Sequence, residues 1–448
     1  MFSTFPHSEG TDSSKTGHFS TKPDIKCTKD VVTVSKERRK GGNPLAALRH
    51  PNYRLFWSGQ AVSVVGTWIQ RACQAWLVLQ ITDSAFLLGV VGAVQFLPVL
   101  FLSLVAGVIA DRVSKRQLVL WTQLSLGLQA FILAYLVYSN QVQYWHILVL
   151  SLFQGICTAF DQPTRQALIV EMVGKEDLMN AIALNSALFN GARIIGPAIG
   201  GLTMDWFGPS LAFFLNGVSY LFVVAALAFM KFPGKPAAVK ERRFWPEIRE
   251  GLLFAKNTPI IRDTLILVGL TGVSARNMTI LIPVLAKQAL GQTATGYGVL
   301  MSFMGAGALL GAVSLAWMAH LGPNRAVLYT GAFALVVFEL LLAIPQGFAT
   351  AAVLIFLLGW ANITYSATAN TSLQVNTPNH LRGRVMSLYS LLNGGTSPVG
   401  NLYAGTACDL FGASGGFLAC GGAGLIATVA VFALEKKRGF QKDNMEIA

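Results

Sequence analysis

The chain has 448 residues, of which 53% are hydrophobic and only 12% are charged, and its mean hydropathy is +0.53. Soluble domains carry roughly 25% charged residues, so this composition excludes an ordinary soluble protein and predicts a chain embedded in a lipid bilayer. The net charge of +13 would suggest nucleic-acid binding in a soluble protein. In a membrane protein it indicates basic cytoplasmic helix ends, so we expect no nucleic-acid partner.

The apolar segments divide the chain into two similar halves. Residues 1–50 are predicted to be a disordered cytoplasmic tail, because most of them are polar and no long apolar run occurs. About twelve segments follow, each long enough to cross a hydrocarbon core of about 30 Å. We expect an all-α membrane protein with six-helix bundles at 51–230 and 263–434, a cytoplasmic linker at 231–262 and a second tail at 435–448. The predicted spans lie near 54–80, 85–110, 117–138, 146–168, 180–204, 209–230, 263–287, 296–318, 325–345, 349–373, 384–407 and 414–434.

The distribution of basic residues predicts the orientation of these spans. Most of the 34 Lys and Arg residues lie in the two tails, in the linker or in short loops on the same side. Lys287 is the exception, because it falls in a loop on the opposite side. Since basic residues accumulate on the cytoplasmic side, both termini are expected to be cytoplasmic.

A short charged segment, Gly107–Arg116, separates the second and third predicted spans, and we call it the elbow. The two halves also resemble each other at a spacing of roughly 200 residues, a sign of internal repetition. Gly89–Pro98 aligns with Gly298–Gly307, and Asn190 aligns with Asn393. Two related bundles predict a binding site at their interface near the middle of the membrane.

The elbow resembles the loop signature G-x-x-x-D-R-x-G-R-K of the major facilitator superfamily, found between its second and third helices. Ser114 stands where the family usually has Gly, and because Ser carries a Cβ that resists positive φ, a less tight turn is expected. The residues that match are Gly107, Asp111, Arg112, Lys115 and Arg116.

A second signature lies in the predicted span 180–204 and resembles the antiporter motif in the fifth helix of exporters of this superfamily. Glycines on one helix face permit close helix packing, and Pro with flanking Gly provides a hinge. Plain packing of small residues is the alternative reading. The motif consists of Gly191, Gly196, Pro197, Gly200 and Gly201.

Three longer runs are similar to the bacterial branch that contains the enterobactin exporter and related drug-efflux proteins: the run from Asn43 to Gln70, AFDQPTRQAL and LRGRVMSLYS. The resemblance implies alternating-access export of a siderophore-like or drug-like solute across the bacterial inner membrane, by a monomer with the proton as coupling ion. An importer or uniporter of an anionic metabolite remains the alternative. Neither a nucleotide-binding loop nor a metal-ligand or nucleophile pattern occurs, so no cofactor, metal or enzymatic activity is expected.

Charged and polar side chains within the spans predict the substrate cavity. A charge at the bilayer centre costs about 2.5–3.5 kcal/mol on insertion scales, so Arg71, Arg193 and Arg276 are expected to face a cavity or a partner. By resemblance their helices line the central cavity, which would make it cationic and suited to an anionic solute. Alternatively, each arginine is a structural partner of a backbone carbonyl. Arg71 also shares a polar stripe of the span 54–80 with Gln70 and Gln74, and the alternative for this stripe is that it only bonds neighbouring helices. The remaining cavity candidates are Gln70, Gln74, Asn190, Asn277, Tyr365 and Asn393.

A charge network is expected at the cytoplasmic ends of the spans. Asp161 and Arg165 are four residues apart, so they share a helix face and are predicted to pair. By resemblance, Asp111 would join Arg165 and Arg384 in a network that holds the cytoplasmic gate shut, whereas a fixed structural ion pair is the alternative. The candidates for proton coupling are Asp161 and Glu339, the latter being the only carboxylate well inside a span of the second half.

Overall fold

A computed structural model describes residues 45–230, 244–318 and 324–447. Within these ranges the chain forms helices and no strand, which confirms the all-α expectation. Seven stretches of the described chain are long and apolar enough to cross a membrane. Helices α1, α4 and α5 have 32, 30 and 30 residues but are not among these stretches, because polar residues within them lower their mean hydropathy.

The helices of the N-terminal half are separated by very short turns. Glycine closes two of them, because Gly174 and Gly208 adopt φ of 69° and 82°, a region that a Cβ disfavours. Proline begins α1 and α6 at the first helical position, where its missing N–H costs nothing. A 3-10 helix, Ala46–Arg49, precedes α1. The helices are α1 (Pro51–Thr82), α2 (Ala85–Arg112), α3 (Lys115–Tyr138), α4 (Tyr144–Val173), α5 (Leu178–Phe207) and α6 (Pro209–Phe229).

The C-terminal half is more interrupted than the N-terminal half. Its longest helix, α14, turns at Gly412, whose φ is 70°. A five-residue π-helix, η2 (Leu285–Ala289), follows α9. The helices are α7 (Phe244–Asn257), α8 (Pro259–Ser274), α9 (Met278–Val284), α10 (Ala294–Trp317), α11 (Arg325–Leu341), α12 (Phe348–Val375), α13 (Asn379–Gly395) and α14 (Ser397–Ile447).

Several helix boundaries differ from those expected. The predicted span 263–287 is broken at Ala275–Asn277 into α8 and α9, and the span 384–407 is divided at Thr396 between α13 and α14. The expected linker contains α7, and the end of the expected tail contains the 3-10 helix with buried Ala47. Apolar runs predict that a segment is buried, but they do not reveal interruptions that neighbouring side chains stabilise.

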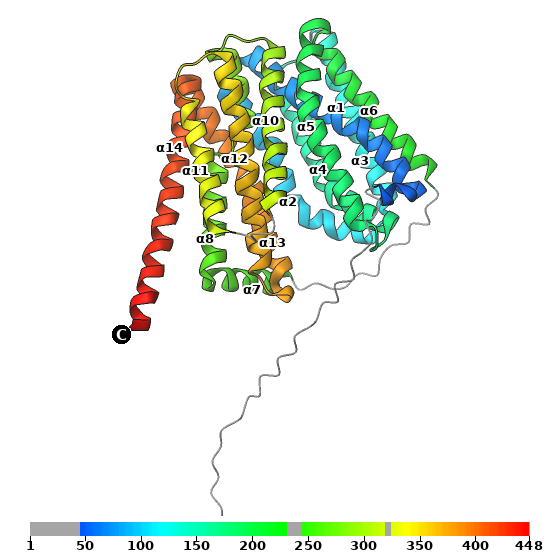
Figure 1. The fold of residues 1–448 in the computed structure, drawn as a ribbon. Helices are drawn as coiled ribbons and strands as arrows, with labels where there is room; N and C mark the ends of the chain where they lie inside the picture. Colours follow the sequence, from blue (N-terminus) through cyan, green and yellow to red (C-terminus); the bar gives the residue numbers. More distant parts are fainter. Residues whose placement is uncertain (1–44, 231–243, 319–323, 448) are drawn as a thin grey trace, which may run out of the picture. The chain divides into compact units, whose positions relative to one another are not determined.

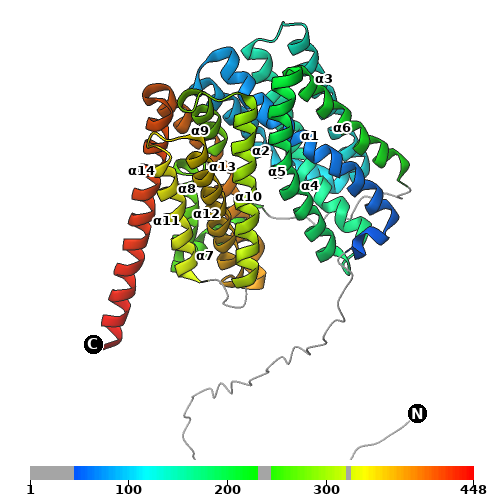
Figure 2. The ribbon, with the colours of Figure 1, turned by 45° about the horizontal axis from the view of Figure 1, so that its top comes forward.

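The helices pack in two groups, α1–α6 and α8–α14, which meet along two long contacts (Figures 1 and 2). Helix α5 packs on α10, and α2 packs on α14. Helix α7 lies across the end of the C-terminal half at which the elbow is also found. We call this end the elbow end, and the opposite end, with the turns at 83–84, 208 and 412, the far end.

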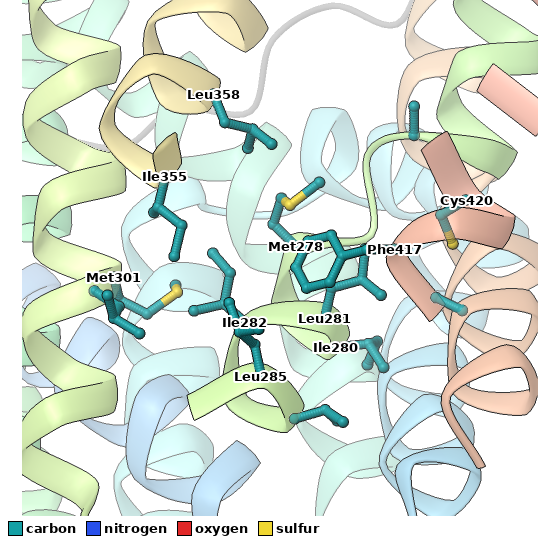
Figure 3. Close-up of a cluster of buried hydrophobic side chains, with 14 of the residues drawn as sticks. Met278, Ile280, Leu281, Ile282, Leu285, Met301, Ile355, Leu358, Phe417 and Cys420 are labelled. Atoms are coloured by element: carbon teal, nitrogen blue, oxygen red, sulfur yellow. The ribbon is translucent and has the colours of Figure 1, made fainter. Parts of the chain in front are cut away.

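The core of the C-terminal half is built around the short helix α9 (Figure 3). Met278, Ile280, Leu281 and Ile282 extend from it and are at most 4% exposed. They contact Met301 of α10, Ile355 and Leu358 of α12, and Phe417 and Cys420 of α14. Burial of this apolar side-chain surface holds the broken helix in place although its backbone ladder is interrupted.

Candidate functional site

A polar pocket opens within the N-terminal half, between α1, α3, α4, α5 and α6. Its volume is about 70 Å³, which accommodates a few water molecules but is well below the roughly 300–1,000 Å³ of a pocket for a drug-sized ligand. The lining residues include Gln60, Ser63, Thr67, Trp68, Arg71, Gln123, Gln154, Thr158, Asp161, Gln162, Arg165, Phe189 and Tyr220.

Asp161 is the most heavily bonded residue of this pocket. Its Oδ1 accepts hydrogen bonds from Thr122 Oγ1 at 3.0 Å and Gln123 Nε2 at 2.9 Å. Its Oδ2 lies 3.1 Å from Arg165 Nη2, so the predicted pair forms. Arg165 also donates to Gln60 Oε1 at 3.0 Å. Helices α1, α3 and α4 are thereby tied together around one neutralised carboxylate.

Arg71 lies in the same pocket without a carboxylate partner among the described side chains. Its guanidinium sits 5.2 Å from the centre of the Trp68 ring, a cation–π contact. Trp68 in turn packs edge-on against Phe189, with ring centres 5.7 Å apart. Since Arg165 compensates Asp161, the charge of Arg71 remains and the pocket carries a net positive charge.

Gln70 and Gln74 do not line this pocket although they belong to the same polar stripe. Gln70 donates to Gln129 Oε1 at 3.1 Å and accepts from Asn216 Nδ2. Gln74 donates to Ser151 Oγ at 2.9 Å. Both side chains are at least 94% buried, so in this structure they bond neighbouring helices, as the alternative interpretation held.

The candidates of the C-terminal half cluster at the break between α8 and α9. Arg276 donates through Nη1 to Asn393 Oδ1 at 2.5 Å. Asn277 is 2% exposed and donates to Val273 O at 2.8 Å, capping the interrupted end of α8. Tyr365 is fully buried, and its hydroxyl lies 2.9 Å from Thr271 Oγ1.

The two remaining candidates lie on α5. Asn190 donates to Ser186 O of its own helix at 2.8 Å. Arg193 is half-buried, and its Nε and Nη2 have no hydrogen-bond partner in the described part of the chain. The structure therefore brings Arg276 and Asn393 together.

The elbow anchors helices of its own half. Lys115 Nζ lies 2.6 Å from Glu171 Oε1 of α4. Arg116 donates to Leu227 O at 2.7 Å and to Ala228 O at 3.0 Å, which places a cation at the C-terminal end of α6. Arg112 is exposed, and the side chain of Asp111 lies outside the described residues.

Ser114 fits the turn of the elbow without strain. Its φ is −62° and its ψ is 114°, an ordinary extended conformation for a residue with a Cβ. Gly107 lies within α2, with open space where a Cβ would stand. Neither position therefore depends on the conformational freedom of glycine.

The expected gate residues bond within their own halves. Arg165 is held by Asp161 and Gln60, whereas Arg384 of α13 pairs with Glu250 of α7 at 2.5 Å. The network of Arg165 and Arg384 with Asp111 therefore remains a prediction, and it would require a different arrangement of the two halves.

The motif of α5 consists mostly of close-packing positions. A Cβ on Gly196 would stand 2.5 Å from Trp68 Cβ, and one on Gly201 would collide with Ala294 O of α10. Gly200 faces Cys73 of α1, and Pro197 O touches Gly298 of α10. Helix α5 continues through Pro197 to Phe207, so the motif serves close packing here, in agreement with the alternative reading.

Glu339 of α11 is fully buried, and neither carboxyl oxygen has a hydrogen-bond partner in the described part of the chain. A carboxylate without partners in apolar surroundings costs several kcal/mol. The group is therefore expected to carry a proton in this conformation.

Sequence reasoning missed the uncharged members of the pocket, such as Gln123, Gln154 and Tyr220. Gln123 and Gln154 lie within the apolar runs 117–138 and 146–168, and a glutamine within such a run could have indicated a polar pocket. Glu171, the partner of Lys115, lies just beyond the apolar run 146–168 and was not among the expected gate residues.

Comparison with known proteins agrees with this architecture. A family model described as transmembrane secretion effector matches residues 42–447. The multidrug efflux pump Tap of Mycolicibacterium fortuitum is 29% identical over 77% of this chain and 86% of its own length. The staphyloferrin A transporter of Staphylococcus aureus is 25% identical over 86% of this chain and 96% of its own length. A crystal structure of the nucleoside transporter NupG matches with a TM-score of 0.71 at 11% identity, over 86% of this chain and 99% of that chain, which shows the fold alone.

The glycine contacts predict unequal effects of two substitutions in α5. Gly201→Ala should destabilise the protein by roughly 1–3 kcal/mol, because the new methyl group collides with the backbone of α10. Gly191→Ala meets open space and should be neutral or stabilising by up to about 1 kcal/mol. Thermal unfolding in detergent micelles measures both, and equal midpoints for the two variants would contradict the packing role of Gly201.

Proposed function

Because the chain belongs to the transmembrane secretion effector family of the major facilitator superfamily, we propose that it is a secondary active exporter of a small anionic organic solute. The protein is a multi-pass membrane transporter rather than an enzyme. The observation that supports the solute class is the uncompensated positive charge of Arg71 in the pocket of the N-terminal half.

The proposed topology has twelve spans with both termini in the cytoplasm of a bacterium, and it places the protein in the inner membrane. The N-terminal bundle comprises 51–230, the linker 231–262 and the C-terminal bundle 263–434, with tails at 1–50 and 435–448. The excess of basic residues at the elbow end supports this orientation. A monomer suffices, because each chain contributes both halves.

The pocket is proposed to bind the charged group of the solute rather than the whole molecule. Its volume of about 70 Å³ matches a carboxylate or phenolate group better than a complete siderophore or drug. The solute's remaining part would lie between the halves, toward Arg193 and Arg276, each of which has an unpartnered guanidinium nitrogen in the described chain. Guanidinium groups bind planar anionic groups through paired hydrogen bonds.

Direction and energy source are further parts of the proposal. The relative Tap is named an efflux pump, which supports export, and proton antiport would supply the energy. Of the two coupling candidates, Asp161 is already neutralised by Arg165, whereas Glu339 has neither a cation nor a hydrogen-bond partner in the described chain. We therefore favour Glu339 as the proton-binding group.

The elbow is proposed to act as the cytoplasmic gate in the state that is closed on that side. Asp111, Arg112, Lys115 and Arg116 would then approach α13, where Arg384 would exchange its bond with Glu250. Asp161 would continue to hold Arg165 in position. We propose that the motif from Gly191 to Gly201 acts as a hinge only when the protein changes to the state that is closed on the cytoplasmic side.

An importer or uniporter of an anionic metabolite is the second candidate, because the related staphyloferrin A transporter is named for its solute and not for a direction of transport. Inverted and right-side-out membrane vesicles distinguish the candidates. An exporter should accumulate an anionic siderophore in inverted vesicles when a proton gradient is imposed, and a protonophore should abolish the accumulation. Accumulation in right-side-out vesicles alone would contradict export.

Arg71→Ala should weaken the binding of anionic solutes and spare neutral ones. Loss of a hydrogen-bonded charge corresponds to about 1.5–3 kcal/mol, roughly a ten- to hundredfold increase in Kd. Binding of an anionic siderophore and of an uncharged dye to the purified protein measures the difference. Arg54→Ala, which removes an exposed arginine at the elbow end, is the matched control, and an equal loss for both ligands would contradict a cationic subsite.

Glu339→Gln should uncouple transport from the proton gradient while preserving the fold, because the amide imitates a protonated carboxyl group. The variant should exchange solute across vesicles at equilibrium but fail to accumulate it against a gradient. Asp161→Asn, which changes the other candidate for proton coupling, is measured in the same assay for comparison. Normal proton-driven accumulation by Glu339→Gln would show that the buried carboxyl group is only structural.

A further inference from the structure

Asp409, near the end of the first segment of α14, contacts the beginning of α2 in the opposite half. Its Oδ2 accepts a hydrogen bond from Ser84 Oγ at 2.8 Å, and its Oδ1 accepts one from Ala85 N at 2.7 Å. Ser84 is the N-cap residue of α2. A carboxylate of the C-terminal half therefore caps a helix of the N-terminal half.

Asp205, near the end of α5, makes the reciprocal contact with α10. Its Oδ2 accepts hydrogen bonds from Thr293 Oγ1 at 2.6 Å and from Thr295 N at 2.9 Å. Thr293 is the N-cap residue of α10. A carboxylate of the N-terminal half therefore caps a helix of the C-terminal half with the same combination of a hydroxyl and a backbone N–H.

The two contacts occupy equivalent positions of the internal repeat. Asp205 and Asp409 are separated by roughly the same 200 residues that relate Asn190 to Asn393, and Ser84 and Thr293 are separated by a similar interval. An isolated surface contact has no reason to recur in this way. Two copies at corresponding places indicate a common role at the far end.

Both contacts place negative charge where a helix carries partial positive charge. The first backbone N–H groups of a helix have no partner within it, and its dipole favours an anion there. A third contact follows the same rule with opposite sign, because Lys287 of η2 donates to Leu79 O at the end of α1, 2.6 Å away. Lys287 also lies 2.8 Å from Asp83 Oδ1, and this ammonium group lowers the pKa of the Asp83 carboxyl.

We propose that Asp205 and Asp409 are paired positioning residues that hold the far end closed in this conformation and release α10 and α2 when it opens. The role rests on the proposed transport by alternating access. Asp205, Asp409 and Thr293 are exposed, so water takes over their hydrogen bonds when the halves separate. Each contact is consequently weak enough to break in every cycle, whereas the buried Asp161 and its partner Arg165 remain paired.

The bonding at the elbow end is consistent with this role. Arg165 and Arg384 bond within their own halves there, while at the far end Asp205, Asp409 and Lys287 bond across the halves. The described structure thus has charge contacts between the halves at the far end. Loss of the far-end contacts is expected to shift the population toward the state in which that end is open.

The test is a distance measurement between the halves at the far end in the full-length protein. Spin labels are attached to cysteines at Gln141 and Ala349, which are exposed in the turn after α3 and in the first turn of α12, after the native cysteines have been replaced. In lipid nanodiscs, Asp205→Ala and Asp409→Ala should each increase the ratio of long to short distances roughly three- to tenfold. The double variant should increase it by about the product of the two factors.

The conservative variants and a control separate closure from stability. Asp205→Asn keeps an oxygen that accepts both hydrogen bonds and loses only the charge, so its shift should be smaller than that of Asp205→Ala. Asp409→Asn loses one of two accepting oxygens and should shift more than Asp205→Asn. Glu176→Ala, which removes an exposed carboxylate at the elbow end, should leave the distances unchanged.

The distance measurement needs no solute, so it fails independently of the proposed transport function. Unchanged distances in all four Asp variants, with wild-type thermal stability, would overturn the role of these carboxylates even if the protein exports solutes. A shift toward the long distance without any transport in vesicles would instead contradict the exporter proposal. If the alanine variants do not fold, the two asparagine variants decide the question through their predicted order.

Discussion

The ion pair between Asp161 and Arg165 determines the electrostatics of the N-terminal half. A buried carboxylate must be neutralised and hydrogen-bonded, and Arg165, Thr122 and Gln123 meet both requirements. Because Arg165 is engaged there, the pocket retains the charge of Arg71 and has a positive character. The same engagement keeps Arg165 in its own half in this conformation, away from the helix that carries Arg384.

Polar side chains in this protein have two different environments, within the helices and at the helix ends, and this position decides how stable their hydrogen bonds are. Within the helices, lipid offers no hydrogen-bond partners, and Gln70 and Gln74 bond neighbouring helices in this structure. At the ends of the helices, water competes for every hydrogen bond. Contacts such as those of Asp205 and Asp409 can therefore break and reform, which suits residues between moving halves.

Much of the organisation could be predicted from the sequence, since the order of apolar and charged residues along the chain indicates helical spans. The pairing of Asp161 with Arg165 follows from their spacing, whereas the elbow signature and the motif of α5 are assigned by resemblance to a known superfamily. The interruption at Ala275–Asn277 could not be predicted, because Asn277 and the apolar contacts of α9 stabilise it from elsewhere in the chain. Neither the partner of Arg384 nor the contacts of Asp409 is visible at the level of sequence.

By itself, the sequence determined that the chain is helical, lies in a membrane and carries arginines within its spans, because these properties reside in runs and periodicities of neighbouring residues. The tertiary structure decided which of those side chains face a pocket and which only bond another helix. It also decided that the glycines of α5 are contact points and that carboxylates of each half cap helices of the other. Such choices depend on side chains separated by long stretches of chain, and only packing brings them together.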